Sequence, residues 1–208
     1  MNSQRTDLVI AIDGPAGAGK STVSRSLAST LGIERLDTGA MYRAVAAAAI
    51  HHGSDLHDVV ALVGLASALT VAGDGEVLVA DLAVGHLLRL ETTNSAVSIV
   101  AATPQVREVL VSHQRQWVQD RNGCGVVEGR DIASVVFPDA TLKVYLTASA
   151  EERAKRRADE GAASVLRRDE VDSTRAVSPL HIAPGSRVLD TTGRTIDDVT
   201  SEILSWLQ

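Results

Sequence analysis

Eight residues near the N-terminus, Gly14-Pro-Ala-Gly-Ala-Gly19-Lys20-Ser21, fit the pattern G-x-x-x-x-G-K-[ST] at every fixed position. The glycines let the backbone curl so that its N–H groups point inward at phosphate oxygens. Lys20 would bring a positive charge to the β- and γ-phosphates of a nucleotide, and Ser21 a hydroxyl ligand to Mg²⁺. The apolar run LVIAI at 8–12 predicts a buried strand just before this loop, and 21–31 predicts a helix just after it. This context predicts a nucleotide-phosphate site.

Three further segments place arginine beside an acid: Asp37 to Arg43, Glu128 to Asp131, and Arg168 to Arg175. Loops that follow parallel strands gather on one rim of the sheet, which is also where the phosphate loop lies. An arginine there can form two parallel hydrogen bonds to a dianionic phosphate. Surface ion pairs could explain any one segment alone. Three of them in a phosphate-loop protein favour a site for a phosphorylated acceptor.

Predicted strands alternate with predicted helices along the chain. The strands lie at 8–12, 125–127, 142–146 and 187–189, and the helices at 21–31, 38–52, 55–69, 104–120, from 149, and 195–206. This order predicts an α/β fold of the P-loop kinase type, with a mostly parallel sheet of about five strands and helices on both faces.

Two segments interrupt that order within a single predicted kinase domain, 1–208. Residues 70–72 and 77–80 flank Gly73-Asp74-Gly75, which predicts a β-hairpin in a small β-containing insert near 70–90. Charged residues surround Gly161, and we expect 156–168 to form a short lid that moves over the nucleotide.

Composition excludes several classes of protein. The 208 residues include 45% hydrophobic residues, enough for one core, but only 2% aromatic residues, and the net charge is −6. A nucleic-acid-binding surface usually needs a basic excess or stacking aromatics, so no nucleic-acid partner is expected. Cys124 is the single cysteine, and no apolar run is long enough to span a membrane. We expect a cytoplasmic monomer with no membrane partner.

Five segments together resemble the bacterial cytidylate kinases. They are GPAGAGKST, LDTGAMYRAV, EGRDIASVVFPDA, SAEERAKRR and DSTRAVSPL, and they occur in the family's order from about Val9 to Leu189. The resemblance implies transfer of the γ-phosphoryl group of ATP, with Mg²⁺, to CMP or dCMP. The sequence departs from the family at Ala133-Ser134, where Gly-Thr is usual.

The resemblance also implies a role for individual residues. The ATP phosphates would be bound by Gly14, Pro15, Ala16, Gly17, Ala18, Gly19, Lys20, Ser21 and Thr22. The acceptor phosphate would be held by Arg43, Arg130 and Arg175, with Thr38 and Tyr42 lining that site. Ser98, Arg107 and Asp131 would read the cytosine ring, and Arg168 and Asp172 would reach the sugar and the phosphates. The expected catalytic residues are Lys20, Arg130, Arg168 and Arg175.

Elementary chemistry agrees with part of this assignment. Cytosine presents an amino donor at N4 beside acceptors at N3 and O2, so an acid such as Asp131 and a donor such as Arg107 can select it over uracil. In a helix that begins after Ser149, Arg153 and Arg157 share one face, where one could cover the adenine and the other reach the phosphates.

Other functions remain open from the sequence. One is a P-loop kinase for UMP, AMP or a sugar acid. Another is a nucleotide-binding module without catalysis, which the presence of Lys20, Ser21 and the arginines disfavours. A nucleic-acid-dependent ATPase is disfavoured by the acidic charge and the scarcity of aromatic residues.

Overall fold

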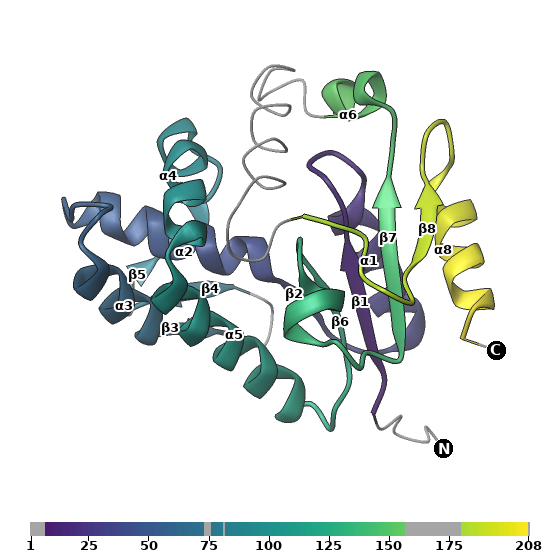
Figure 1. Ribbon diagram of the computed structural model, residues 1–208, viewed down its shortest axis with the longest axis horizontal. Coiled ribbons are helices and arrows are strands. Elements are labelled where there is room, and N and C mark those ends of the chain that lie inside the picture. Colours follow the sequence, from purple (N-terminus) through teal and green to yellow (C-terminus); the bar gives the residue numbers. More distant parts are fainter. Residues whose placement is uncertain (1–6, 73–75, 81, 157–179, 208) are drawn as a thin grey trace. The chain divides into compact units, whose positions relative to one another are not determined.

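The computed structural model describes residues 7–72, 76–80, 82–156 and 180–207. The chain forms two compact units, residues 1–36 with 115–208 and residues 37–114 (Figure 1). The predicted lid lies almost wholly outside the described residues, and so do Arg157, Arg168, Asp172 and Arg175. Within the described parts of the chain, no helix is long and apolar enough to cross a membrane.

The first unit is built on a five-stranded sheet with the order β2-β6-β1-β7-β8. Its strands are β2 (Arg35–Asp37), β6 (Gly125–Glu128), β1 (Val9–Asp13), β7 (Leu142–Thr147) and β8 (Arg187–Asp190). Strand β1 lies in the middle, where Ile10 pairs in parallel with Val126 on one side and Leu142 on the other. The predicted α/β fold with a parallel sheet of five strands is therefore confirmed. Strand β2 was not predicted, because three residues carry too little pattern to be recognised.

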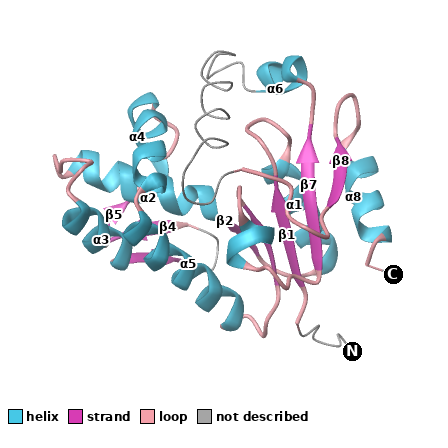
Figure 2. Ribbon diagram, in the orientation of Figure 1, coloured by secondary structure: helices cyan, strands magenta, loops and turns pink. Residues whose placement is uncertain are grey.

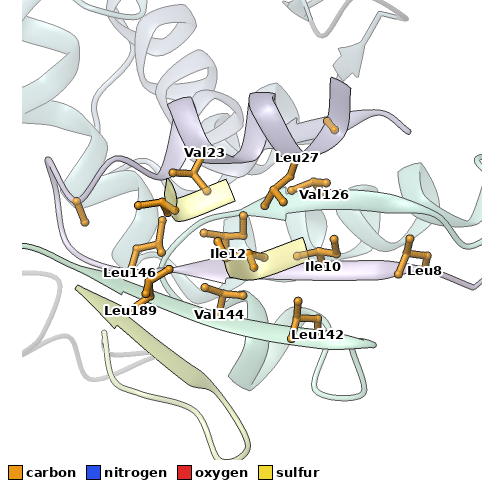
Figure 3. Packing of buried hydrophobic residues seen from close by; sticks show 14 of the residues in the cluster. Leu8, Ile10, Ile12, Val23, Leu27, Val126, Leu142, Val144, Leu146 and Leu189 are labelled. Atoms are coloured by element: carbon orange, nitrogen blue, oxygen red, sulfur yellow. The ribbon is translucent and has the colours of Figure 1, made fainter. Parts of the chain in front are cut away.

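One face of this sheet packs against helices α1 (Lys20–Leu31) and α8 (Ile196–Ser205). Figure 3 shows Ile10 and Ile12 of β1, with Leu8 just before the strand, on the side of the sheet that packs against Val23 and Leu27 of α1. Ile10, Ile12 and Leu27 are fully buried. Burial of each such side chain contributes about 1.5–3 kcal/mol, so this layer is the main anchor of the loop that joins β1 to α1.

The opposite face is covered by the end of helix α5 (Pro104–Gln119) and by a π-helical turn at Ile132–Val136. Gly125 at the start of β6 lies against Trp117, since a Cβ atom there would stand 2.8 Å from the indole ring. Ala11 and Val127, which face the same way in the sheet, are fully buried. Helices thus cover both faces, as the sequence predicted.

The helix ends follow their local sequence. Helix α8 begins with a complete capping box: the Thr195 side chain accepts from the Asp198 N–H, and the Asp198 side chain accepts from the Thr195 N–H. The Thr195 hydroxyl also holds the pKa of Asp198 below its usual value. Before α6 (Ala150–Arg156) only half of such a box is formed: the Ser149 hydroxyl accepts the Glu152 N–H, while the Glu152 carboxylate accepts from Arg156.

The second unit is built around helix α2 (Thr38–His51) (Figure 2). The alanine-rich middle of this helix is buried. Around it lie α3 (Val59–Ser67), α4 (Glu91–Ala102), a 3₁₀ turn (Gly85–Leu87) and a small sheet of β3 (Leu69–Val71), β4 (Val77–Val79) and β5 (Leu82–Ala83). The predicted hairpin is confirmed, with Thr70 opposite Leu78, although its turn lies outside the described residues.

Three features of the second unit differ from the sequence-based expectation. Helix α3 begins at Val59 rather than near Asp55, because the Asp58 carboxylate accepts the Ala61 N–H and caps the helix there. Strand β5 and helix α4 were not predicted at all. After Glu91, helix α4 continues with TTNS, residue types that are weak helix formers, and its packing against α2 stabilises it instead.

Candidate phosphate-binding and acceptor site

The glycine-rich loop joins the end of β1 to the start of α1, at the carboxyl edge of the parallel sheet. Gly14 has φ +149°, and a Cβ atom there would stand 2.1 Å from the carbonyl oxygen of Leu146 on the neighbouring strand β7. Gly17 and Gly19 have φ values of +78° and +90°, in the left-handed region. The loop needs glycine at these positions to turn tightly against the sheet.

Lys20 closes this loop from the inside. Its Nζ atom donates to the carbonyl oxygens of Gly14 and Pro15, at 2.7 Å each, and the residue is only 8% exposed. The ammonium charge and the N-terminal end of α1 both favour an anion at the loop. This is the arrangement expected of a site for nucleotide phosphates.

Two arginines of α6 lie against the outside of the loop, and one of them bonds it. Arg153 donates from Nη1 to the Ala16 carbonyl at 3.1 Å and from Nε to the Ala148 carbonyl at 3.2 Å. Its backbone oxygen would stand 2.8 Å from a Cβ atom on Gly17. Arg156, which the sequence analysis did not select, has Nη1 3.6 Å from the Cβ position of Gly19. The expected contact of Arg153 with the nucleotide stays a prediction; the described contact of its guanidinium is with the loop backbone.

Glu128 is a functional candidate that the sequence analysis missed. It is the last residue of β6, beside β1, and is 2% exposed. Its Oε2 atom accepts from the Ser21 hydroxyl at 2.8 Å, and its Oε1 atom accepts from Ser24 at 3.0 Å and from Arg35. The signal available in the sequence was an acid at the end of a buried strand.

The pair of Ser21 and Glu128 suits Mg²⁺. Mg²⁺ prefers oxygen ligands and is usually held by one or two carboxylates together with the phosphates of its nucleotide. The described residues contain no group of three His, Cys, Asp or Glu side chains that could hold a metal ion alone. A hydroxyl and a buried carboxylate beside the phosphate loop therefore fit a nucleotide-borne Mg²⁺.

Asp13, the last residue of β1, organises the segment after β6. Its carboxylate is 2% exposed and accepts the N–H groups of Ile132 at 2.9 Å and Ala133 at 2.8 Å. Burial raises the pKa of Asp13 to about 6; the Asp131 charge adds to the rise, and the two N–H donors and Lys20 oppose it. Asp13 accepts from the backbone of Ala133, so this contact does not depend on the side chain at position 133.

The predicted acceptor residues Arg130 and Asp131 lie in the same unit, directly after β6. Asp131 is 6% exposed, and Arg130 donates from Nη1 to the Gly129 carbonyl at 3.3 Å. The two N–H groups that Asp13 accepts belong to the residues immediately after Asp131, so Asp13 fixes the path of this segment.

The remaining described acceptor candidates belong to the second unit. The guanidinium of Arg107 lies 5.7 Å from the centre of the Tyr42 ring, and both residues are buried. Arg43 pairs with Asp37 at 3.1 Å, and Asp37 also caps α2 by accepting the Ala40 N–H. Thr38 is the buried first residue of α2, and Ser98 is a half-buried residue of α4. The assembly of one acceptor site from both units stays a prediction.

A phosphate loop between β1 and α1, with a lysine inside it and an acid on the adjoining strand, defines a P-loop nucleotide-binding fold. The comparisons agree: shikimate kinase from Acinetobacter baumannii has a similar structure, with a TM-score of 0.50 at 15% identity, covering 98% of this chain and 93% of that one. At that identity the likeness concerns the fold alone.

The sequence comparisons then identify the family. Residues 10–208 match the model of the family described as cytidylate kinase. Cytidylate kinase from Rhodococcus opacus is 47% identical over 96% of this chain and 94% of its own length. Cytidylate kinase from Mycobacterium leprae is 44% identical over 96% of this chain and 95% of its own length. The chain belongs to the cytidylate kinase family and is an enzyme of the nucleoside monophosphate kinase class.

Proposed function

We propose that this enzyme transfers the γ-phosphoryl group of ATP to CMP or dCMP, which gives ADP and the nucleoside diphosphate. The structural observation that carries the proposal is the phosphate loop with Lys20 inside it and Glu128 hydrogen-bonded to Ser21. Full-length relatives named cytidylate kinase supply the acceptor class. We further propose that the protein works in the cytoplasm as a monomer.

The donor end of the reaction is assigned to the loop. Backbone N–H groups and Lys20 would bind the β- and γ-phosphates, and the negative charge that moves between them during transfer would meet the ammonium group. Ser21 and Glu128 would hold Mg²⁺, which neutralises phosphate charge when it is bound. An acceptor phosphate is already ionised at neutral pH, so the chain needs no general base.

The acceptor end is assigned to residues of both units. Arg43, Arg130 and Arg175 would bind the acceptor phosphate and align it with the γ-phosphate, with Thr38 and Tyr42 beside them. Asp131 would accept from the N4 amino group of cytosine, Arg107 would donate to N3 or O2 beside it, and Ser98 would also contact the ring. Arg168 and Asp172 would contact the sugar and the phosphates, and Arg153 and Arg157 the nucleotide of the donor site.

The test is an assay of ADP release with each nucleoside monophosphate in turn. We expect CMP and dCMP to give the highest kcat/KM, with UMP and AMP well below them and little release without an acceptor. Preference for UMP, AMP or a sugar acid would replace the proposed acceptor. Tight ATP binding without acceptor-dependent release would indicate a nucleotide-binding module instead of a kinase. The variant K20A serves as the inactive control.

A further inference from the structure

Thr191 lies directly after β8, and its side chain reaches the phosphate loop. The Oγ1 atom is 3.1 Å from the Ala18 carbonyl oxygen, which belongs to the loop, and 3.1 Å from the Thr147 carbonyl oxygen at the end of β7. The residue is 3% exposed. Ala18 and Thr191 are 173 positions apart, so only the fold brings them into contact.

The surrounding donors decide where the hydroxyl proton of Thr191 goes. Arg156 donates from Nη1 to Oγ1 at 2.8 Å and from Nη2 to the Thr191 carbonyl at 2.8 Å. The Thr147 carbonyl already accepts the Thr191 N–H at 2.8 Å. A hydroxyl has a single proton to donate. We therefore assign the hydroxyl proton of Thr191 to a hydrogen bond with the Ala18 carbonyl oxygen. Arg156 donates to a lone pair of the same Oγ1 atom.

This bond acts on the inner surface of the loop through a single peptide unit. The Ala18 carbonyl and the Gly19 N–H belong to one planar trans peptide, so they point in opposite directions. Gly19 has φ +90°, and glycine adopts alternative backbone conformations at little steric cost. The loop sequence alone therefore leaves the orientation of this peptide weakly defined. A hydrogen bond from Thr191 to Ala18 holds the Gly19 N–H pointing away from Thr191.

We propose that Thr191 is a positioning residue of the nucleotide site: its hydroxyl orients the Ala18–Gly19 peptide so that the Gly19 N–H can donate to a nucleotide phosphate. The inference rests on the proposed nucleotide-binding role of the loop. Arg153 orients the Ala16–Gly17 peptide in the same way: its hydrogen bond to the Ala16 carbonyl fixes the direction of the Gly17 N–H. Thr191 and Arg153 thus hold two peptides of the loop, Ala18–Gly19 and Ala16–Gly17, from outside.

The experiment compares T191V, which removes the hydroxyl at nearly constant volume, with T191S, which keeps it. The control is T200V in α8, because Thr200 is also buried, at 4% exposure, and its hydroxyl has no partner among the described residues. Affinity for ADP is measured by calorimetry in the absence of any acceptor, at a temperature where each variant is folded by circular dichroism. We expect T191V to bind ADP roughly tenfold more weakly, T191S to stay within about twofold of wild type, and T200V to be unchanged.

Each outcome decides the proposal. Equal ADP affinity in T191V and wild type would overturn it, even if the melting temperature of T191V fell, because that pattern belongs to a purely structural residue. If T191V does not fold, T191A takes its place with the same expected loss of affinity and the same overturning result. Since ADP binding needs no acceptor, a wild-type enzyme that fails to phosphorylate CMP would reject the proposed function without affecting this comparison.

Discussion

The hydroxyl of Ser21 donates to the carboxylate of Glu128 across 2.8 Å, and this bond joins the start of α1 to the end of β6. Glu128 also accepts hydrogen bonds from Ser24 and Arg35, so three side chains hold one buried carboxylate beside the phosphate loop. The carboxylate is thereby oriented before any nucleotide arrives. Such preorganisation matters because metal-binding groups work best when their own partners fix them.

Replacing Glu128 with glutamine should therefore weaken the use of Mg²⁺. Glutamine keeps the size of the side chain but removes its charge, and we expect the Mg²⁺ concentration for half-maximal activity to rise roughly tenfold or more at fixed ATP. The matched control is E34Q, since Glu34 pairs with Arg121 at 2.8 Å in the same unit and is half exposed. An unchanged Mg²⁺ requirement in E128Q would remove Glu128 from the metal site.

Replacing Lys20 with alanine should lower kcat much more than it changes the KM for CMP. Lys20 faces charge that develops during phosphoryl transfer, and loss of such a group costs about 10²–10³ in kcat. The measurement is ADP release with both substrates saturating. The control is K143A, because Lys143 makes an exposed hydrogen bond to the Pro184 carbonyl, away from the phosphate loop. Wild-type kcat in K20A would contradict the mechanism proposed for the loop.

Replacing Asp131 with asparagine should reduce the preference for CMP over UMP. An amide can present either a donor or an acceptor, so it no longer opposes the carbonyl at position 4 of uracil. The quantity to measure is the ratio of kcat/KM for the two nucleotides, with D139N as an exposed control. A variant that loses activity but keeps its selectivity would show that Asp131 orients its neighbour Arg130 instead of reading the base.

Asp13 should make stability depend on pH in a direction opposite to that of most carboxylates. Its pKa is raised from 3.8 to about 6 in the folded protein, so the folded state holds a proton that the unfolded chain has released. The free energy of unfolding therefore falls as pH rises through this window, by up to about 3 kcal/mol.

The check is the difference in unfolding free energy between wild type and D13N, measured by urea denaturation from pH 3.5 to pH 7.5. As pH rises, the unfolding free energy of wild type should fall relative to that of D13N, and the difference should become constant once Asp13 is ionised. A constant difference, or a change of the opposite sign, would show that the carboxyl group is not destabilised by its burial.

Two glycine substitutions should have opposite effects on stability. Gly14→Ala places a Cβ atom 2.1 Å from the Leu146 carbonyl at φ +149°, and we expect a loss of about 3 kcal/mol or more. Gly64→Ala lies within α3, where a Cβ atom meets nothing within 4 Å, and we expect a gain of about 0.5–1 kcal/mol. Thermal denaturation of both variants checks this, and a G14A protein as stable as wild type would refute the close approach of loop and strand.

Much of the fold could be predicted because the relevant signals are local. Strand β1 is rich in β-branched apolar residues, β6 has the apolar pair Val126-Val127, β7 alternates apolar residues with others, and α1 carries its apolar residues at helical spacing. The phosphate loop was recognisable for the same reason: its glycines, Lys20 and Ser21 lie within eight consecutive positions. Over such distances the backbone conformation follows mainly from the residues themselves.

The contacts that build the site could not be predicted in this way. Glu128 meets Ser21 across 107 positions, Ala133 meets Asp13 across 120, and Thr191 meets Ala18 across 173. Each contact depends on which strands are neighbours in the sheet and on their register. Sheet order and register arise from packing of the whole core, because no short segment can bury its apolar face alone. For that reason the sequence indicates which residues can bind phosphate, and the tertiary structure selects the side chains that hold them in place.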